Sequence, residues 1–389
     1  MYNVVSERKF PEEMDFGNFS FRIRELLKND GKKKILYTLN EFNNSTFRYR
    51  YFNFRETLRN SSEYSVVCFE SAELPSVSPY ISTVTAVVFQ RALLDNCTNN
   101  FLHLCKNFEI PTVYDIDDLI YNEDCILDYV TNIGLDPNHQ NISYLLGTAA
   151  GHTCIAKHCD SFITTTTYLK EHLVRDFGKP TYVIPNYYNM EQENCSADAV
   201  KNRVQDKSKY YIGYFSGSNS HQNDFGVCRE AIIDLMKKYS NIYLKIVGFM
   251  TLENELAVFH DEGRVIFKPI CSYEELQYEI AEVDLNVAPL VNYYFNDCKS
   301  ELKFFESAIV KVPSVMSAVG VYNDIIKNGE NGFICKENEW FDTLEKMYLD
   351  RELSEKIAEN AYNYARENYH YDNFEPLIKK TLDAVSKKD

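Results

Sequence analysis

Short apolar runs rich in β-branched and aromatic residues alternate along the chain with longer segments whose apolar residues recur at helical spacing. Several short runs are apolar at almost every position, which is typical of parallel strands covered on both faces. The first half of the chain predicts strands at residues 34–39, 64–69, 86–89, 112–115, 161–165 and 182–184. The second half predicts strands at residues 211–215, 243–247, 265–267, 285–288, 314–317 and 332–334.

Helical patterns fill the spacers, and we expect helices at 91–108 (with a loop inside this segment), 143–159, 227–239 and 272–281. The polar segment 191–209 lacks periodicity, so we interpret it as a linker between two βαβ domains. The predicted fold class is α/β, with two Rossmann-like domains facing each other across a cleft, at residues 1–190 and 210–368. The tail reads as helices only, and we expect its last part, 369–389, to cross back onto the first domain.

Residues 1–30 precede the first predicted strand and form an extension of the first domain. Apolar and basic residues mix between Phe19 and Lys28, which fits either a helix packed on that domain or a basic amphipathic segment at a membrane surface. We favour the packed helix. The first residues carry charges and no apolar signal core, and no run approaches the roughly 18 apolar residues that span a bilayer. We therefore expect a soluble, cytoplasmic protein.

The chain is strongly acidic, which narrows its partners. Its formal net charge is -16 at pH 7, and such a surface repels the phosphates of nucleic acids, so we expect no nucleic-acid partner. An acidic protein that binds an anionic ligand must concentrate positive charge at the binding site, so each basic residue in a candidate pocket points to such a site. The 11 cysteines have no zinc-binding spacing, and we expect them to be reduced and mostly buried.

The segment 296–306 (NDCKSELKFFE) offers the strongest candidate chemistry. It follows the predicted strand 285–288, and Ser300 is a suitable N-cap for a helix that would begin at Glu301 and end before Pro313. Backbone N–H groups at such a helix start suit a diphosphate, at the sheet edge where open α/β folds bind ligands. Lys299 and Lys303 would add positive charge. The plainer alternative is a solvated helix start with an ion pair between Lys303 and a carboxylate three residues on.

That carboxylate, Glu306, is also placed to accept hydrogen bonds from ribose hydroxyls. A second candidate is the small-residue loop that follows the strand 211–215. There Gly217 allows a close approach of backbone to phosphate, and hydroxyls and a ring nitrogen stand nearby. These nearby side chains belong to Ser216, Ser218 and His221. A plain turn is the alternative for this loop.

Three aspartates follow the strand 112–115 at its ligand-binding edge, at positions 115, 117 and 118. Such carboxylates can bind sugar hydroxyls, hold a metal or transfer protons, or they can cap the next segment. We do not expect a metal, because no further cluster of ligands is evident. Four polar residues follow other strands of the first half and are candidates for the cleft or a structural role: Arg48, Arg50, Arg91 and Asn186.

Taken together, these segments resemble the GT-B glycosyltransferases of the group 1, or family four, class. In the second half the resemblance rests on 284–290 (DLNVAPL), on the 296–306 segment, on Tyr322 and on 328–333 (NGENGF). The opening strand and loop, 213–217 (GYFSG), also resemble that class. Landmarks of the first half are 114–119 (YDIDDL) and 184–186 (IPN). The resemblance covers about residues 33 to 375.

The resemblance implies a glycosyltransferase that moves a sugar from a nucleotide-diphosphate sugar to a saccharide or lipid-linked acceptor, with retention and without a metal or other cofactor. The nucleotide would lie on the second domain and the acceptor on the first. One departure concerns the family's two glutamates separated by seven residues: Glu306 matches the second, but Cys298 stands at the first, beside Asp297. The lysines at 299 and 303 are similar to a variation seen in surface-polysaccharide enzymes of the class.

We accordingly assign three catalytic candidates, namely Asp117, Asp118 and Lys303. The donor nucleotide and its diphosphate are assigned to Ser216, Gly217, Ser218, His221, Lys299, Ser300, Lys303 and Glu306. A lipid-linked acceptor would draw the protein to the inner face of the membrane as a peripheral contact. Two alternatives stay open: a catalytically silent nucleotide-sugar-binding partner subunit, and another enzyme of this architecture, such as an epimerase or a polymer phosphotransferase.

Overall fold

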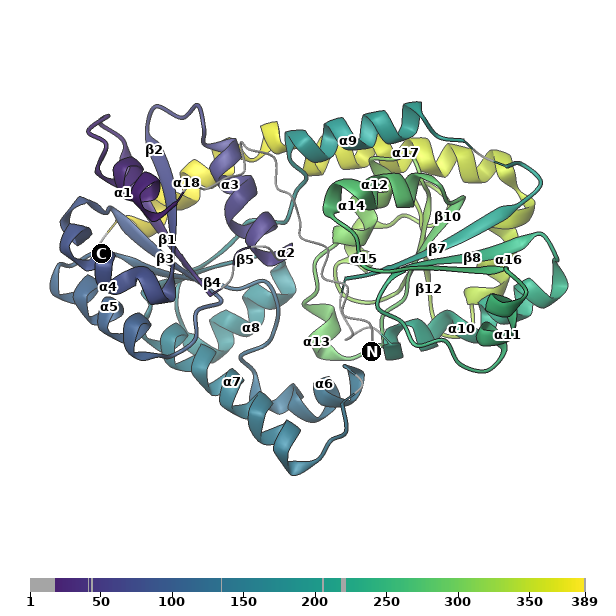
Figure 1. The fold of residues 1–389 in the computed structure, drawn as a ribbon, viewed down its shortest axis with the longest axis horizontal. Helices are drawn as coiled ribbons and strands as arrows, with labels where there is room; N and C mark the ends of the chain where they lie inside the picture. Colours follow the sequence, from purple (N-terminus) through teal and green to yellow (C-terminus); the bar gives the residue numbers. More distant parts are fainter. Residues whose placement is uncertain are drawn as a thin grey trace.

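A computed structural model of the protein describes residues 18–40, 42, 45–133, 135–204, 206–217 and 222–387. The chain forms two lobes, each built on a parallel six-stranded sheet (Figure 1). The first sheet has the order β2-β1-β3-β4-β5-β6 and the second β12-β11-β10-β7-β8-β9. This confirms the predicted α/β class with two Rossmann-like domains.

All twelve strands predicted from the sequence are present, with ends that shift by one residue at most. Those of the first sheet are β1 (Lys33–Leu39), β2 (Tyr64–Glu70), β3 (Ala86–Gln90), β4 (Thr112–Asp115), β5 (Ser161–Thr164) and β6 (Thr181–Val183). Those of the second are β7 (Tyr210–Ser216), β8 (Ile242–Gly248), β9 (Val265–Lys268), β10 (Leu285–Ala288), β11 (Ser314–Ser317) and β12 (Phe333–Cys335). The central strands are buried along their length because helices cover both faces.

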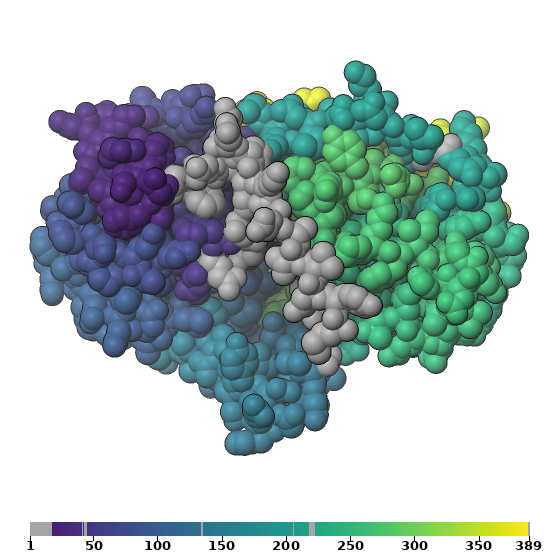
Figure 2. All heavy atoms as spheres, viewed as in Figure 1, coloured from purple at the N-terminus to yellow at the C-terminus, as the bar shows by residue number. Residues whose placement is uncertain are grey.

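The helices of the first domain are α1 (Phe19–Leu27), α2 (Ser45–Phe47), α3 (Asn53–Thr57), α4 (Leu74–Val77), α5 (Asn96–Asn107), α6 (Ile126–Asn132), α7 (His139–His158) and α8 (Thr167–Phe177). A π-helical turn, η2 (Arg48–Phe52), joins α2 to α3. Helix α1 packs on β2 and buries Arg22 and Leu26, as favoured from the sequence for the extension. Helices α6 and α7 form a hairpin that projects below the junction of the two lobes and is the blue projection at the bottom of the space-filling view (Figures 1 and 2).

The second domain and the tail contribute α9 (Met190–Lys201), α10 (Gln222–Lys238), α11 (Glu255–Asp261), α12 (Tyr273–Ala281), α13 (Tyr294–Asp297), α14 (Leu302–Ala308), α15 (Tyr322–Ile325), α16 (Trp340–Leu349), α17 (Arg351–Tyr369) and α18 (Glu375–Val385). None of the helices in the described part of the chain is long and apolar enough to cross a membrane. Each of the 11 cysteines is a free thiol.

The interpretation of 191–209 as an aperiodic linker was wrong for its first part, which is helix α9. The helix begins at the N-cap Asn189 and packs along α12 of the second domain. Its buried face consists of Gln192, Ser196 and Ala199, and the Ser196 hydroxyl donates to Gln277 at 2.9 Å. Because this face is mostly polar, the helix leaves no apolar periodicity in the sequence.

The chain crosses between the domains twice, first after β6 and then between α17 and α18. Helix α17 packs on α14 of the second domain, whereas α18 lies on the first domain, where Asp383 accepts from Lys33 at 2.9 Å. The two crossings lie side by side. The Tyr188 amide donates to the Tyr369 carbonyl at 3.2 Å, and the rings of Tyr187 and Phe374 stack at 4.1 Å.

Candidate functional site

Hydrogen bonds between the domains mark where the carboxyl ends of the two sheets meet. The Asn186 amide donates to the Ser300 hydroxyl at 3.0 Å, and the Tyr49 hydroxyl donates to a carboxylate oxygen of Glu306 at 2.6 Å. A third contact runs from the Thr166 hydroxyl to the carbonyl of Cys298 at 3.2 Å. Candidates from both halves of the sequence therefore lie at one junction.

Lys303 is the most unusual charged residue of this junction. It extends from α14 with its Nζ atom buried and without a hydrogen-bond partner among the described residues. The ammonium lies 5.0 Å from the centre of the Tyr214 ring, on β7. Burial lowers the pKa of Lys303 to about 8, an effect that Asp224 and Glu306 oppose and Lys299 reinforces. The ion pair with a neighbouring carboxylate, the plainer reading of the sequence, is not formed in the described structure.

Glu306 lies one turn further along α14. Its carboxylate is held by the Tyr49 hydroxyl, which comes from the π-helical turn of the first domain. Burial raises the pKa of Glu306, and the hydrogen bond from Tyr49 opposes this rise. A partly buried carboxylate that accepts from a hydroxyl across the domain junction is chemically suited to accept from other hydroxyls.

The start of α14 differs from the sequence prediction. The helix covers Leu302–Ala308, its N-cap is Glu301, and no side chain caps it. Ser300 therefore does not cap the helix; its hydroxyl accepts from Asn186 instead. Burial raises the pKa of Glu301 to about 7, and one of its carboxylate oxygens has no partner among the described residues. The helix ends at Ala308, before Pro313 as expected, and the residues after it form tighter turns in which the Val310 and Lys311 amides donate to Ser307 and Ala308.

Lys299 precedes α14, so it does not share a helical face with Lys303 as the sequence suggested. Its ammonium lies 5.1 Å from the centre of the Phe295 ring and 4.0 Å from a carboxylate oxygen of Asp118. Lys299 thus reaches toward the first domain, while Lys303 points toward β7. The two cations border the junction from different sides.

The small-residue loop begins where β7 ends. Ser216 is buried, and its carbonyl accepts from the Phe249 amide at 3.2 Å. Gly217 is exposed, and a Cβ atom added to it would meet nothing within 4 Å. The neighbouring Gly248 has φ +112°, and a Cβ there would lie 1.8 Å from the Ser216 carbonyl oxygen, so glycine is required. Two further predicted residues of this loop, Ser218 and His221, lie outside the described residues.

Asp117 and Asp118 are joined to Arg91 rather than used as helix caps. The Arg91 guanidinium donates to both carboxylates, and its side chain is about a quarter exposed. Burial lowers the pKa of Arg91, but the two carboxylates outweigh it and hold that pKa above its usual range. Arg91 also has φ +43°, and its carbonyl accepts from Asn40 at 2.8 Å. A strained backbone held in place beside two carboxylates is common at functional sites.

The remaining candidates divide between the cleft and the core. Arg48 crosses the junction: it donates to Gln192 at 2.6 Å and lies 3.5 Å from the centre of the Tyr273 ring. Arg50, in contrast, does not face the cleft. Its side chain is fully buried in the first domain, where it forms a bidentate pair with Asp115 at 2.9 and 3.2 Å. Burial raises the pKa of Asp115 to about 6, and Arg50 opposes the rise.

Sequence reasoning did not assign several residues that the structure brings to this site. Asp224, at the first turn of α10, is fully buried and accepts from the Val291 amide at 2.9 Å and from Asn296 at 3.0 Å. Its negative charge favours the protonated form of Lys303 and so raises the pKa of that lysine. The ring of Tyr214 also contacts the Lys303 ammonium. In the sequence Asp224 belongs to the loop segment that resembles the GT-B class, but its partners Val291 and Asn296 are distant in sequence and could not be predicted.

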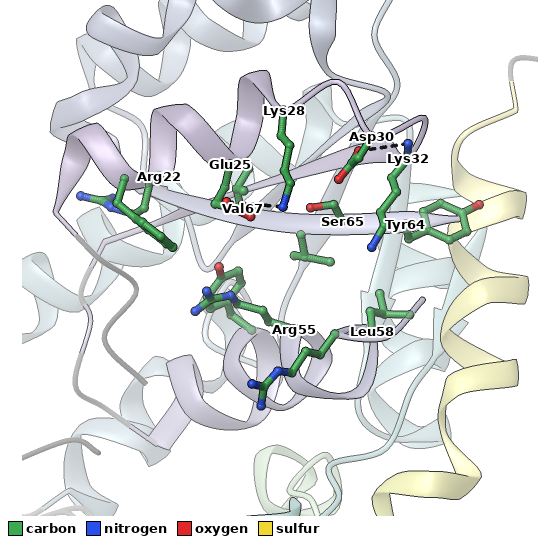
Figure 3. A pocket seen from close by; sticks show the side chains of 14 residues that line it. Arg22, Glu25, Lys28, Asp30, Lys32, Arg55, Leu58, Tyr64, Ser65 and Val67 are labelled. Atoms are coloured by element: carbon green, nitrogen blue, oxygen red, sulfur yellow. Dashed lines mark hydrogen bonds and ion pairs between the residues drawn. The ribbon is translucent and has the colours of Figure 1, made fainter. Parts of the chain in front are cut away.

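A cavity elsewhere in the first domain lies outside this site. It is enclosed by α1, the edge strand β2 and α3, where Arg55, Lys28 and Lys32 surround Ser65 (Figure 3). None of the predicted site residues lines it. Within the part of the chain that the structure describes, no group of three His, Cys, Asp or Glu side chains is placed to hold a metal ion.

Comparison with known proteins shows which family model and which solved structures the chain resembles. The family model of the glycosyl transferases group 1 matches residues 197–364, which comprise most of the second domain. The chain has the GT-B glycosyltransferase fold. HepE of Anabaena, solved with UDP and glucose, is 14% identical, with a TM-score of 0.61 over 90% of this chain and 100% of that one. Sucrose-phosphate synthase of Thermosynechococcus elongatus is 13% identical, with a TM-score of 0.63 over 91% and 99% of the two chains.

A further GT-B structure of similar size is WaaG, a glycosyltransferase involved in lipopolysaccharide biosynthesis. It is 13% identical and has a TM-score of 0.62 over 91% of this chain and 100% of WaaG. No curated protein matches the sequence. The group 1 match spans β7, α14 and the loops between them, so Lys303, Glu306 and Gly217 all lie within it.

Proposed function

We propose that the protein is a metal-independent, retaining glycosyltransferase that moves a sugar from a nucleotide-diphosphate sugar to a saccharide or lipid-linked acceptor. The observation that carries this proposal is the buried ammonium of Lys303, which has no hydrogen-bond partner in the described structure and lies at the carboxyl edge of the second sheet. A buried cation without a partner is costly, and an anion that binds beside it removes that cost. HepE, which shares the fold, holds UDP and glucose.

In this proposal the diphosphate lies between Lys303, Lys299 and the backbone after Ser216. Negative charge grows on the diphosphate as its bond to the sugar breaks. Fixed cations in a site closed to water stabilise that charge most in the transition state, so they lower the barrier to transfer. Because the two lysines supply this positive charge, the reaction does not require a metal.

Glu306 would bind the ribose. Its carboxylate already accepts from the hydroxyl of Tyr49, and the hydroxyls of a ribose offer the same donors. Within the junction, Glu306 lies three residues after Lys303 on α14, so a nucleotide with its diphosphate at the lysine can place its ribose at the glutamate. Ser300 and Asn186 join the domains beside this position.

Asp117 and Asp118 would orient the acceptor or the transferred sugar. Arg91 fixes both carboxylates, and Asp118 lies 4.0 Å from Lys299 of the other domain. Sugar hydroxyls are well matched to carboxylates that are held rigidly by an arginine fork. Removing either carboxylate should therefore lower turnover more than it changes donor affinity.

The biological setting is also part of the proposal: synthesis of a surface glycan in the cytoplasm, with a peripheral contact at the inner face of the membrane when the acceptor is lipid-linked. The support is the resemblance of the lysine-containing segment to surface-polysaccharide enzymes of the class. Floating the protein with vesicles that carry a lipid-linked acceptor, and with vesicles that lack it, tests this setting.

The decisive experiment is a thermal-shift screen against UDP, GDP, dTDP, CDP and ADP and their common sugars. A ligand at about one hundred times its dissociation constant should stabilise the protein by about 2.7 kcal/mol. We expect one nucleotide to do so, with the shift lost in Glu306→Ala and Lys303→Met and kept in Glu359→Gln, which alters an exposed surface pair. No shift with any nucleotide would contradict the proposal.

Product analysis with a labelled donor then identifies the reaction. Transfer to an acceptor with the donor's anomeric configuration supports the retaining glycosyltransferase. Cys298 keeps the silent partner subunit as a second candidate, because this fully buried thiol occupies the position of the family's first glutamate. Donor binding without transfer to any acceptor would favour that candidate, and an epimerised or phosphate-linked product would favour another enzyme class.

A further inference from the structure

A second cavity adjoins the proposed reaction centre. Its volume is about 190 Å³, and it lies between the loop after β4, helices α6 and α7 of the projecting hairpin, and α13 of the second domain. Most of its lining is apolar and comes from Leu119, Ile120, Cys125, Ile126, Tyr129, Leu145 and Phe295. Thr148, His152 and Arg91 complete the wall.

The cavity shares a wall with the carboxylates of the site. Arg91 lines it and at the same time donates to Asp117 and Asp118. Only the side chain of Arg91 therefore separates a group inside the cavity from the two carboxylates that would orient an acceptor hydroxyl. Phe295 lies next to Lys299 on the other domain, so the cavity also faces the donor side of the junction.

The polar groups around the cavity carry no net positive charge. Arg91 is matched by two carboxylates, and Lys299 lies 4.0 Å from one of them. Burial lowers the pKa of His152 to about 4, so this ring is neutral near pH 7, and its Nδ1 lies 2.8 Å from the Tyr114 hydroxyl. A phosphate would find no uncompensated cation here, which distinguishes this cavity from the one in Figure 3, where bases outnumber acids.

Two aromatic rings from opposite domains line the cavity. The rings of Tyr129 and Phe295 lie 4.8 Å apart at 39° and contact each other, so together they form one aromatic wall against which a bound apolar group can pack. Apolar cavities of about 150 Å³ in proteins hold a molecule of the size of benzene. The size, the aromatic walls and the absence of net charge all fit one hydrophobic ring or a short hydrophobic chain.

We infer that this cavity binds a hydrophobic aglycone, the neutral apolar group that an acceptor carries next to its reacting sugar. The inference rests on the proposed function and names its acceptor class: a glycoside with an aryl or alkyl group rather than a free sugar or a sugar phosphate. The hydroxyl to be glycosylated would then lie at Asp117 and Asp118, with the aglycone packed against Tyr129 and Phe295.

Ligand-detected NMR tests the inference without knowledge of the natural acceptor. The probes are phenyl, hexyl and methyl β-D-glucopyranosides, titrated in the presence of the nucleotide that the thermal screen identifies, or without nucleotide if none is found. We expect the phenyl or the hexyl glycoside to bind about ten- to a hundredfold more tightly than the methyl glycoside, the scale of burying several apolar carbons. Equal binding of all three, or no binding of any, would overturn the inference.

A matched pair of variants on α7 locates the binding. Thr148→Phe fills the cavity from a half-buried position and should weaken binding of the phenyl glycoside at least tenfold. Tyr144→Phe, one turn earlier and 72% exposed, should leave it unchanged. Thr148→Phe should also keep the nucleotide-induced thermal shift. Unaltered binding of the phenyl glycoside to Thr148→Phe would overturn the inference. If the wild-type protein binds no nucleotide at all, that result would overturn the proposed function instead.

Discussion

Lys303 should make nucleotide binding depend on pH in a range where few side chains titrate. Burial lowers its pKa to about 8, and only the protonated form attracts a diphosphate. The lysine is then about nine-tenths protonated at pH 7 and about one-tenth protonated at pH 9. If the charged form alone binds, the dissociation constant should rise about tenfold between these values. The diphosphate itself is already about nine-tenths ionised at pH 7, because its last ionisation lies near pH 6, so it adds little to this dependence.

Calorimetric titration of the nucleotide at half-unit steps of pH measures this dependence. Repeating the titration at pH 8 in buffers of different ionisation enthalpy should show uptake of about half a proton, because binding an anion returns the proton to Lys303. Lys303→Arg is the matched variant, since a guanidinium stays protonated throughout and should give a flat profile, whatever its affinity. A constant dissociation constant in the wild type, or the same slope in the variant, would refute this reasoning.

The same burial has a consequence for the free protein. The pKa of Lys303 in the folded state lies below its usual value of 10.5, so the charged lysine opposes folding at pH 7 and this opposition disappears as the pH rises from about 8 to 10.5. Lys303→Met should therefore stabilise the ligand-free protein at pH 7, on the order of 1 to 3 kcal/mol. Chemical denaturation at pH 7 measures this, and a destabilised variant would show that the ammonium has a partner in solution.

Three further substitutions test other parts of the structure. Asp115→Asn should lower the free energy of unfolding by about 3–5 kcal/mol, because it leaves the fully buried Arg50 without its counter-ion; a loss below about 1 kcal/mol in chemical denaturation would contradict this. Tyr49→Phe should tighten nucleotide binding about three- to tenfold by calorimetry, since the ribose no longer displaces a hydrogen bond to Glu306; weaker binding would mean that the tyrosine contacts the ligand. Gly248→Ala should lower the free energy of unfolding by several kcal/mol and lower the melting temperature, because the new Cβ would lie 1.8 Å from the carbonyl oxygen at the end of β7. An unchanged melting temperature would show that the loop can shift.

The strands could be predicted from the sequence because parallel strands covered on both faces leave continuous apolar runs. Helix α9 could not, because the face it buries on α12 is formed largely by Gln192 and Ser196. The Ser196 hydroxyl donates to Gln277 of α12 and the Gln192 side-chain carbonyl oxygen accepts from Arg48, and a hydropathy pattern does not register such contacts.

The candidate site was predictable only where its chemistry is local. Lys303 and Glu306 share one short segment whose pattern resembles a known class, so the sequence indicated them. The hydroxyl that holds Glu306 belongs to Tyr49, 257 residues away, and no local pattern connects the two. For the same reason the sequence left a cleft role and a structural role open for Arg50, because its partner Asp115 lies 65 residues further along the chain and draws the guanidinium into the core.

The pair of adjacent crossings between the domains restricts how the lobes can move apart. A single tether would allow one lobe to swing and twist about the other, whereas two tethers joined through Tyr188 and Tyr369 leave chiefly one rotation, about an axis that runs through them. In Figure 1 this axis lies at the upper side of the junction, and α6 and α13 lie at the lower side, furthest from it. The mouth beside α6 and α13 should therefore widen most in each opening. Under the proposed function, the product bearing the new sugar would depart there, and the nucleotide, nearer the axis, would be released later.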